Sequence, residues 1–540
     1  MKQNTLLILL ALGLSFNING QNFTKQDTLR GSITPERAWW DLNYYNLNIK
    51  VQPENESIAG YNIIRYKVLE ESDVIQIDLQ KPLKIDAVSQ DNEDLNYTSY
   101  GPAHFIHLKK KQVPGEFNEL YVQYSGNPRK AKRAPWDGGF SWEKDNNGNP
   151  FVATSCQGLG ASAWWPNKDH MYDEVDSMRI AIDVPKDLVA VANGRLREEY
   201  LYDFGGYKLY DWFVSNPINN YGVNVNIGDY VHFGEKYEGE KGTLDVDYYV
   251  LRDNLDKAKE QFKQTPMMLK AFEHWFGPYP FYEDSFKLVE VPYLGMEHQS
   301  SVTYGNQYQN GYLGRDLSNT GWGLKFDFII IHEGGHEWFA NNITYKDVAD
   351  MWIHEGFTAY SENLYLDYHY GTKAASEYVI GTRANIQNDI PIIGTYNVNK
   401  KGSGDMYYKG ANMLHTLRQL IEDDTLWREI LRGLNAEFYH QTVTTEQIEN
   451  YISEKTKKDL SAFFNQYLRT TMIPKLEYKL EGKSITHRYV DTVEDFDMPI
   501  RVFTDGKEQW LFPSKEWKTE TLQSSELVFD NNFYILHQKI

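Results

Sequence analysis

Cysteine is almost absent from this chain of 540 residues: Cys156 is the single one. An intrachain disulfide is therefore impossible, and a fold that depends on a disulfide framework is excluded. Basic residues are also few relative to acidic ones, which gives the chain a formal net charge of −20. Such a chain is a poor partner for nucleic acid, because phosphate binding requires a basic surface. We interpret the short basic run at residues 129–133 as a solvated loop.

Long apolar runs are missing as well, with one exception near the N-terminus. Residues 6–14 are apolar, follow Lys2, and precede the small and polar residues 17–21. This pattern is typical of a secretory signal peptide and is too short for a transmembrane helix. We predict a signal peptide at residues 1–20 and an exported protein, either periplasmic or secreted. No later stretch is apolar enough to predict a membrane span.

The hydrophobic pattern after residue 20 changes twice along the chain. Apolar and polar residues alternate at 47–51 and at 178–185, which predicts strands, whereas 256–275 has the period of a helix. Helical patterns continue to about residue 469, and strand patterns return after Pro474. We predict a multidomain α+β protein. Its parts are an N-terminal β-sandwich-like domain at 21–235, a mostly helical catalytic domain at 236–473 and a small C-terminal β module at 474–540.

The clearest chemical signal is the pair His332 and His336, which lie four positions apart. On a helix the two side chains share one face, so both imidazoles can bind one metal ion. Glu333 lies beside that face, where its carboxylate can take a proton from a water molecule that the metal acidifies. Gly334 and Gly335 between the histidines are unexplained by this chemistry, since each costs a helix interior about 1 kcal/mol relative to alanine.

A third metal ligand is expected, because a catalytic zinc ion usually has three protein ligands and one open position. The stretch 352–357 opens the next helical pattern and contains His354 and Glu355. Glu355 is the natural candidate, with His354 as the alternative. The sequence therefore predicts one Zn²⁺ ion held by His332, His336 and Glu355.

Glu355 follows His336 by nineteen residues, and this arrangement resembles the zinc signature of the M1 (gluzincin) metallo-aminopeptidases. The segments 338–341 and 352–357 are similar to the family's continuation of that signature. The resemblance runs from about residue 36 to the end of the chain. It implies an N-terminal β domain, a thermolysin-like catalytic domain and a small β domain. It also leads us to expect that the large C-terminal helical domain common in the family is missing.

Further site residues follow from the resemblance. The segment 294–298, Leu-Gly-Met-Glu-His, is similar to the Gly-x-Met-Glu-Asn exopeptidase motif of the family, although Leu294 and His298 depart from it. The similarity implies that Gly295, Met296 and Glu297 bind substrate, with Glu297 contacting the free α-ammonium group.

Two more segments extend the resemblance. Residues 407–410, Tyr-Tyr-Lys-Gly, are similar to a family motif that carries the catalytic tyrosine. This implies that Tyr407 donates a hydrogen bond to the oxyanion, with Tyr408 as the alternative. Residues 156–158, Cys-Gln-Gly, resemble an N-terminal-domain segment in which Gln157 helps to hold the substrate amine.

Together these features predict a zinc-dependent aminopeptidase whose substrates are peptides with a free N-terminus. Glu333 would act as the general base and Tyr407 as the oxyanion donor. Two alternatives stay open. One is an endopeptidase of the same zinc class, because the segment 294–298 departs from the family motif. The other is a non-catalytic peptide-binding protein with a relic site. A site without the extra helical domain should also accept longer peptides.

Overall fold

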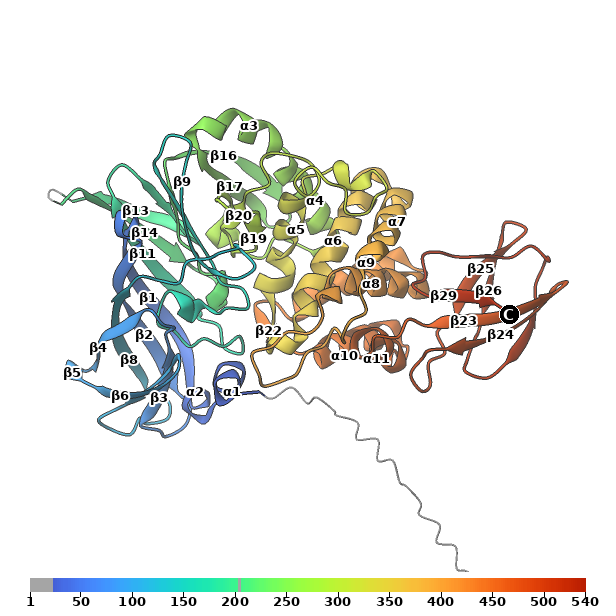
Figure 1. Cartoon of the computed structure of the whole chain (residues 1–540), viewed down its shortest axis with the longest axis horizontal. Coiled ribbons are helices and arrows are strands. Elements are labelled where there is room, and N and C mark those ends of the chain that lie inside the picture. The colour runs from blue at the N-terminus through green and yellow to red at the C-terminus, as the bar shows by residue number, and fades with distance from the viewer. Residues whose placement is uncertain (1–22, 203–204) are drawn as a thin grey trace, which may run out of the picture.

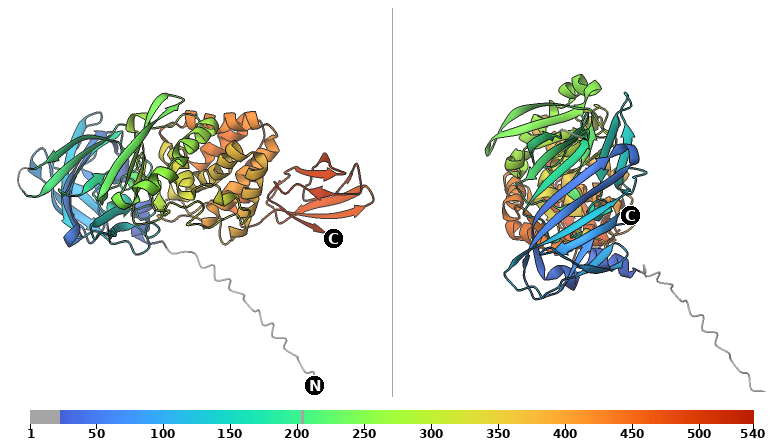
Figure 2. Two further views of the ribbon diagram at one scale, coloured as in Figure 1. Left: turned by 90° about the horizontal axis from the view of Figure 1, so that it is seen from above. Right: turned by 90° about the vertical axis from the view of Figure 1, so that its left-hand side faces the viewer.

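The computed structural model describes residues 23–202 and 205–540, so the predicted signal peptide lies outside the described residues. Figure 1 shows an N-terminal β domain, a helical domain and a small C-terminal β module that lie in a row. The view from above in Figure 2 shows the same order. Across the described part of the chain, no helix combines the length and the apolar character needed to cross a bilayer.

The N-terminal domain is built on a large mixed sheet. Its strand order is β13 (Arg195–Leu201), β14 (Tyr207–Val214), β11 (Ser177–Pro185), β1 (Trp40–Gln52), β2 (Ser57–Val68), β8 (Phe117–Gly126), β4 (Lys84–Gln90) and β5 (Glu93–Asp94). The alternation predicted for residues 47–51 is present in β1, where Leu47, Ile49 and Val51 are buried. These side chains point to one face of the sheet, because successive residues of a strand face opposite sides.

Two smaller sheets share the core of this domain. One has the order β12 (Val189–Val191), β15 (Asn226–Gly228), β10 (Pro150–Ser155) and β9 (Gly139–Lys144). The other has the order β3 (Val74–Asp78), β7 (Ala103–His107) and β6 (Asn96–Tyr100). Two short helices, α1 (Lys25–Gly31) and α2 (Pro35–Ala38), precede β1. Buried residues of all three sheets belong to one hydrophobic cluster, so the domain has a single core.

The catalytic domain begins with a mixed sheet of its own. Its order is β16 (Tyr230–Gly239), β17 (Gly242–Leu251), β18 (Phe286–Glu290), β20 (Val302–Tyr304) and β19 (Gly295–Met296). The predicted division at residue 235 therefore falls inside β16. An alternating pattern identifies a strand but not the sheet that it joins, and this strand pairs with β17.

Helices fill the rest of this domain, which Figure 1 shows in green, yellow and orange. They are α3 (Leu255–Gln261), α4 (Gln264–Phe276), α5 (Phe328–Gly335), α6 (Trp352–Tyr370), α7 (Thr372–Gly381), α8 (Tyr408–Ile421), α9 (Asp424–Glu437), α10 (Thr445–Thr456) and α11 (Ser461–Arg469). Every residue of α6 from Trp352 to Leu366 is buried. A helix that is buried on all sides is central to its domain, and α6 packs against α4, α5, α7 and α8.

The C-terminal module consists of two small sheets. Their orders are β27 (Lys518–Thr521), β24 (Ser484–Val490), β23 (Lys475–Glu481) and β29 (Leu536–Lys539), and β26 (Lys507–Leu511), β25 (Ile500–Thr504) and β28 (Val528–Phe529). The predicted division at residue 474 falls in the segment between α11 and β23. A short parallel pair, β21 (Ile343–Tyr345) with β22 (Gln441–Val443), joins distant parts of the helical domain.

Candidate active site

The histidine motif lies at the end of α5, a helix whose start is fixed by a side-chain cap. The carboxylate of Asp327 accepts hydrogen bonds from the backbone N–H groups of Ile329 and Ile330, at 3.0 and 3.4 Å. His332 lies in the last turn of α5, and His336 is the residue that ends it. Because the His336 backbone is still helical, both imidazoles project to the same side.

Three ligand atoms converge at this place. Oε2 of Glu355, in the first turn of α6, lies 3.3 Å from Nε2 of His336 and 3.8 Å from Nε2 of His332. All three side chains are buried. Within the described residues, Oε2 of Glu355 is a buried oxygen with no hydrogen-bond partner. A buried anionic oxygen facing two imidazole nitrogens fits a divalent cation, and two nitrogens with one carboxylate is a zinc ligand set.

The other ring nitrogen of each histidine is also engaged. Nδ1 of His332 lies 2.7 Å from Oε1 of Glu362, and Nδ1 of His336 lies 3.0 Å from the carbonyl oxygen of Phe339. An Nδ1–H group that donates to these oxygens leaves the lone pair of Nε2 free for a metal. Glu362 was missed from the sequence, although it follows Glu355 by two helical turns and so lies on the same face of α6.

The two glycines of the motif let neighbouring helices approach α5. A Cβ atom on Gly334 would lie 2.6 Å from Met268 Cε of α4, and one on Gly335 would lie 2.5 Å from Ser361 Oγ of α6. Close approach of side chains, rather than of another backbone, therefore explains both positions. Since α6 also carries Glu355, the Gly335 contact helps to bring the third ligand toward the histidines.

Glu333 and Tyr407 complete this side of the site. Glu333 is buried, and burial raises the pKa of its carboxyl group to about 7. The Tyr407 ring lies 6.0 Å from the His332 ring. Burial, and then the negative charges of Glu355 and Glu297, raise the pKa of Tyr407 well above its usual value, which keeps the hydroxyl protonated. The charge that most affects the pKa of Tyr408 is instead that of Glu362, behind the histidines.

Gln157 connects the N-terminal domain to this site. Its side-chain nitrogen donates to Oε1 of Glu297 at 2.6 Å and to Oε1 of Glu355 at 2.9 Å. Glu297 is 3% exposed, so its carboxylate is held almost out of solvent. Two carboxyl groups and an amide thus meet beside the histidines, an arrangement that suits a cationic group.

Comparison with known proteins identifies this arrangement. Residues 260–467 match the Peptidase family M1 domain, and residues 42–221 match the Peptidase M1 N-terminal domain. The chain belongs to peptidase family M1. Family membership confirms the fold class, the hydrolase class and the zinc cofactor that the sequence predicts.

Individual M1 relatives are distant in sequence. The chain is 22% identical over 446 residues to leukotriene A-4 hydrolase of Xenopus laevis. This alignment covers 78% of this chain and 68% of that protein. It is 20% identical over 509 residues to the probable aminopeptidase 1 of Sulfurisphaera tokodaii, with 88% of this chain and 60% of that protein covered. This chain therefore spans only about two thirds of the length of these relatives.

A solved M1 structure has the same fold. The zinc metallopeptidase of Deinococcus radiodurans superposes with a TM-score of 0.69 at 19% sequence identity. The superposition covers 81% of this chain and 96% of that one.

The segment 294–298 of this M1 peptidase lies directly beside the metal ligands. Gly295 belongs to β19, and a Cβ atom there would lie 2.6 Å from Ile329 of α5, so only glycine lets this strand pack on the metal-binding helix. Met296 is buried. The side chain of Asn341 donates to the carbonyl oxygen of Glu297 at 2.9 Å, which ties the segment to the turn after His336.

At two positions where the M1 motifs have asparagine, this chain has His298 and His354, and these histidines have different surroundings. His298 is buried with Nδ1 3.2 Å from Oγ1 of Thr303, and burial lowers the pKa of its imidazole to about 3. His354 is not a metal ligand in this arrangement. Its Nε2 accepts a hydrogen bond from the backbone N–H of Tyr345 at 2.8 Å, so that nitrogen is already used.

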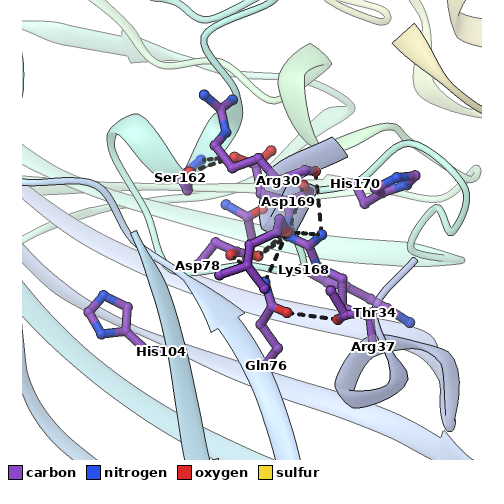
Figure 3. Close-up of polar contacts among 12 residues, drawn as sticks. Arg30, Thr34, Arg37, Gln76, Asp78, His104, Ser162, Lys168, Asp169 and His170 are labelled. Carbon is purple, nitrogen blue, oxygen red and sulfur yellow. Dashed lines mark hydrogen bonds and ion pairs between the residues drawn. The ribbon is translucent and has the colours of Figure 1, made fainter. Parts of the chain in front are cut away.

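Hydrogen bonds within the N-terminal domain fix the loop that carries Gln157. The guanidinium of Arg30 donates to the carbonyl oxygen of Leu159, and Ser162 donates through its backbone N–H and its hydroxyl to Oδ2 of Asp169. Figure 3 shows Ser162 and Asp169 joined in this way. The loop is thus held two to five residues after Gln157.

A buried ion pair anchors this network. Arg37 and Asp78 are 0% and 1% exposed, and Nη2 of Arg37 lies 2.5 Å from Oδ2 of Asp78 (Figure 3). Nη1 of Arg37 also donates to the carbonyl oxygens of Leu29 and Ser32, at 2.7 and 3.0 Å. Arg37 therefore holds the end of α1 against the domain, near the loop of Gln157.

Proposed function

We propose that this M1 peptidase is an exported, zinc-dependent aminopeptidase that removes residues one at a time from peptides with a free N-terminus. The observation that carries the proposal is the pair of hydrogen bonds from Gln157 to Glu297 and Glu355. Because the Gln157 N–H groups are directed at these two carboxylates, its amide oxygen is left to accept from a substrate.

A substrate ammonium group has three N–H donors and a positive charge. Oε1 of Glu297 already accepts from Gln157 and, at 3.1 Å, from the Tyr221 hydroxyl. Within the described residues, Oε2 of Glu297 and the amide oxygen of Gln157 accept no hydrogen bond. These two atoms, with the nearby carboxylate of Glu355, form an acceptor set for an ammonium group next to the metal site.

The position of this anchor determines where the peptide is cut. The same carboxylate, Glu355, takes part in the metal ligand set and in the acceptor set. An ammonium group bound there leaves room for only one residue before the carbonyl group that faces Glu333 and Tyr407. An endopeptidase has no need for a buried charge of this kind beside its metal.

His332, His336 and Glu355 would hold a zinc ion, which would supply Lewis acidity to lower the pKa of water and to polarise a carbonyl oxygen. Glu333 takes a proton from the attacking water and delivers it to the leaving amine. A carboxyl group with a pKa of about 7 can both accept and release a proton near neutral pH. Tyr407 donates its hydroxyl hydrogen bond to the oxyanion that develops on the substrate.

The relatives support this reading of the site. The Sulfurisphaera protein is described as a probable aminopeptidase. A structure of the Deinococcus M1 zinc metallopeptidase contains a Tyr-Ser-Ala substrate. Export is proposed on the N-terminal sequence pattern alone. N-terminal sequencing of the protein from a periplasmic or culture fraction would test it, and a mature chain that still begins at Met1 would contradict it.

One decapeptide in two forms, free and N-acetylated, tests the activity. Purified protein is incubated with each, with and without phenanthroline, and the products are followed by mass spectrometry. We expect stepwise loss of N-terminal residues from the free peptide only, abolished by the chelator. Internal cuts in both forms would replace the proposal with an endopeptidase. No cleavage of either by zinc-loaded protein would replace it with a peptide-binding function.

A further inference from the structure

His354 lies beside the metal ligand Glu355, but its ring faces away from the metal. The backbone N–H of Tyr345 donates to Nε2 of His354 at 2.8 Å. Since a nitrogen that accepts a hydrogen bond presents its lone pair, the neutral imidazole must carry its proton on Nδ1. The Tyr345 ring lies 4.2 Å from the imidazole and keeps it in this orientation.

The proton on Nδ1 fixes the next hydrogen bond as well. Nδ1 of His354 lies 3.3 Å from the hydroxyl oxygen of Tyr221, so His354 is the donor and Tyr221 the acceptor. The hydroxyl hydrogen of Tyr221 must then point elsewhere. Oε1 of Glu297 is 3.1 Å away and accepts it. A backbone N–H in β21 thus determines the direction of every hydrogen bond up to the carboxylate of Glu297.

The result is a carboxylate with two distinct oxygens. Oε1 of Glu297 accepts from Tyr221 and from Gln157, both of which belong to the N-terminal domain. Oε2 is the oxygen that remains for a ligand. Tyr221 is fixed in turn by its short 3₁₀ turn (Asn220–Gly222), which the side chain of Asn219 caps. The chain from His354 to Glu297 therefore crosses the interface between the two domains.

We propose that His354 is a positioning residue for the substrate amine: acting through Tyr221, it holds the Glu297 carboxylate with Oε2 directed at the ammonium group. This proposal rests on the aminopeptidase function proposed above. It also gives a role to a histidine that stands where the M1 motif has asparagine. His354 touches neither the metal nor the reacting atoms, so its effect is confined to recognition of the amine.

A pair of ligands that differ only in the amine isolates this effect. L-leucine hydroxamate and 4-methylpentanoic acid hydroxamate share the metal-binding group and the side chain, and only the first has an α-amino group. The Kd of 4-methylpentanoic acid hydroxamate divided by the Kd of L-leucine hydroxamate reports recognition of the amine alone. Both are measured by calorimetry with zinc-loaded full-length protein. A purely structural change in the site weakens both ligands and leaves the ratio unchanged.

We expect His354→Phe and Tyr221→Phe each to reduce this ratio by about 10- to 100-fold, because a Glu297 carboxylate that is no longer held in place loses its hydrogen bond to the charged ammonium group. The double variant should reduce it no further than one single variant, because both act through the same chain of hydrogen bonds. Tyr210→Phe is the matched control. The Tyr210 hydroxyl is buried and donates a hydrogen bond to the Leu188 carbonyl oxygen, in a part of the N-terminal domain that does not contact the site. The Kd ratio of this variant should equal that of the unmodified protein.

Each outcome has a defined meaning. If His354→Phe fails to fold, Tyr221→Phe tests the proposal alone, since it keeps the bond between His354 and Tyr345. A normal ratio in Tyr221→Phe or in folded His354→Phe would overturn the positioning role and leave the aminopeptidase function standing. Equal binding of both hydroxamates to the unmodified protein would instead remove the amine anchor, and with it both proposals.

Discussion

Gly410 lies against Gly356 where α8 crosses α6. A Cβ atom on Gly410 would lie 3.0 Å from the Gly356 Cα, which is backbone and cannot turn aside. Gly356 follows the metal ligand Glu355, and Gly410 follows Tyr407 by three residues. The absence of side chains at this crossing therefore sets how closely the Tyr407 hydroxyl approaches the metal site.

Gly410→Ala should separate the two helices and move Tyr407 away from the reacting carbonyl. We expect kcat/KM to fall by about 10- to 100-fold, since a displacement near 1 Å has this effect on a catalytic group. Zinc content should be unchanged, because α5 and α6 keep their contact. Gly404→Ala is the control, since a Cβ atom at Gly404 meets nothing within 4 Å. Equal activity in the two variants would show that the helix crossing does not position Tyr407.

Glu362 should contribute to metal affinity without touching the metal. Its carboxylate orients His332 and makes the imidazole more basic through the 2.7 Å contact with Nδ1. We expect Glu362→Gln to weaken zinc binding by about 10- to 100-fold, measured by competition with a chromogenic chelator. Glu377→Gln on α7 serves as the control, because the Glu377 side chain is 44% exposed and accepts a hydrogen bond from Trp322 rather than from a histidine. Unchanged zinc affinity in Glu362→Gln would mean that packing alone orients His332.

Local spacing explains why the convergence of His332, His336 and Glu355 could be predicted and most of the contacts that hold them could not. His332 and His336 are one helical turn apart, and Glu355 begins the next helix, so the sequence itself places them. The contacts that hold them come from far along the chain. Gln157 reaches Glu355 across 198 residues, and Met268 packs on Gly334 from α4. Periodicity carries no information about such pairs, and the sequence indicated Gln157 only through the resemblance of residues 156–158 to the M1 family.

The same limit applies to the fold. The switch from strands to helices and back was predictable, because the period of the hydrophobic pattern changes. A capping box of Thr444 and Gln447 is present at the start of α10, and its Thr-x-x-Gln spacing can be read from the sequence. The place of β16 was not predictable, because its pairing with β17 is decided by tertiary packing. The hydrogen bonds of His354 were not predictable either, since its partners Tyr345 and Tyr221 come from two different domains.

Tyr407 and Tyr408 should differ sharply in their importance. Tyr407→Phe removes the donor to the oxyanion, so kcat should fall by about 100- to 1,000-fold with little change in KM. Tyr408→Phe is the matched control, because the pKa of Tyr408 is raised by burial and then by the charge of Glu362 rather than of Glu355, and its kcat should change little. Both are measured with an aminoacyl-p-nitroanilide under steady-state conditions. The reverse order of effects would assign the oxyanion donor to Tyr408.

The ion pair of Arg37 and Asp78 should be essential for the stability of the N-terminal domain. Arg37→Ala leaves the Asp78 carboxylate buried without its cation and frees the carbonyl oxygens of Leu29 and Ser32. Breaking one side of a buried pair costs about 3–5 kcal/mol, so the thermal unfolding midpoint of this domain should fall by several degrees. The pair of Lys111 and Glu71 is the matched control.

Lys111 and Glu71 also form an ion pair, but their side chains are 67% and 57% exposed. Solvent screens such a pair, so Lys111→Ala should leave the midpoint unchanged. Calorimetry or circular dichroism with full-length protein measures both variants. Because the same network fixes the loop of Gln157, Arg37→Ala should also raise KM for free peptides at temperatures where the protein remains folded. A variant that lost stability but kept its KM would show that Arg30, Ser162 and Asp169 hold the loop without Arg37.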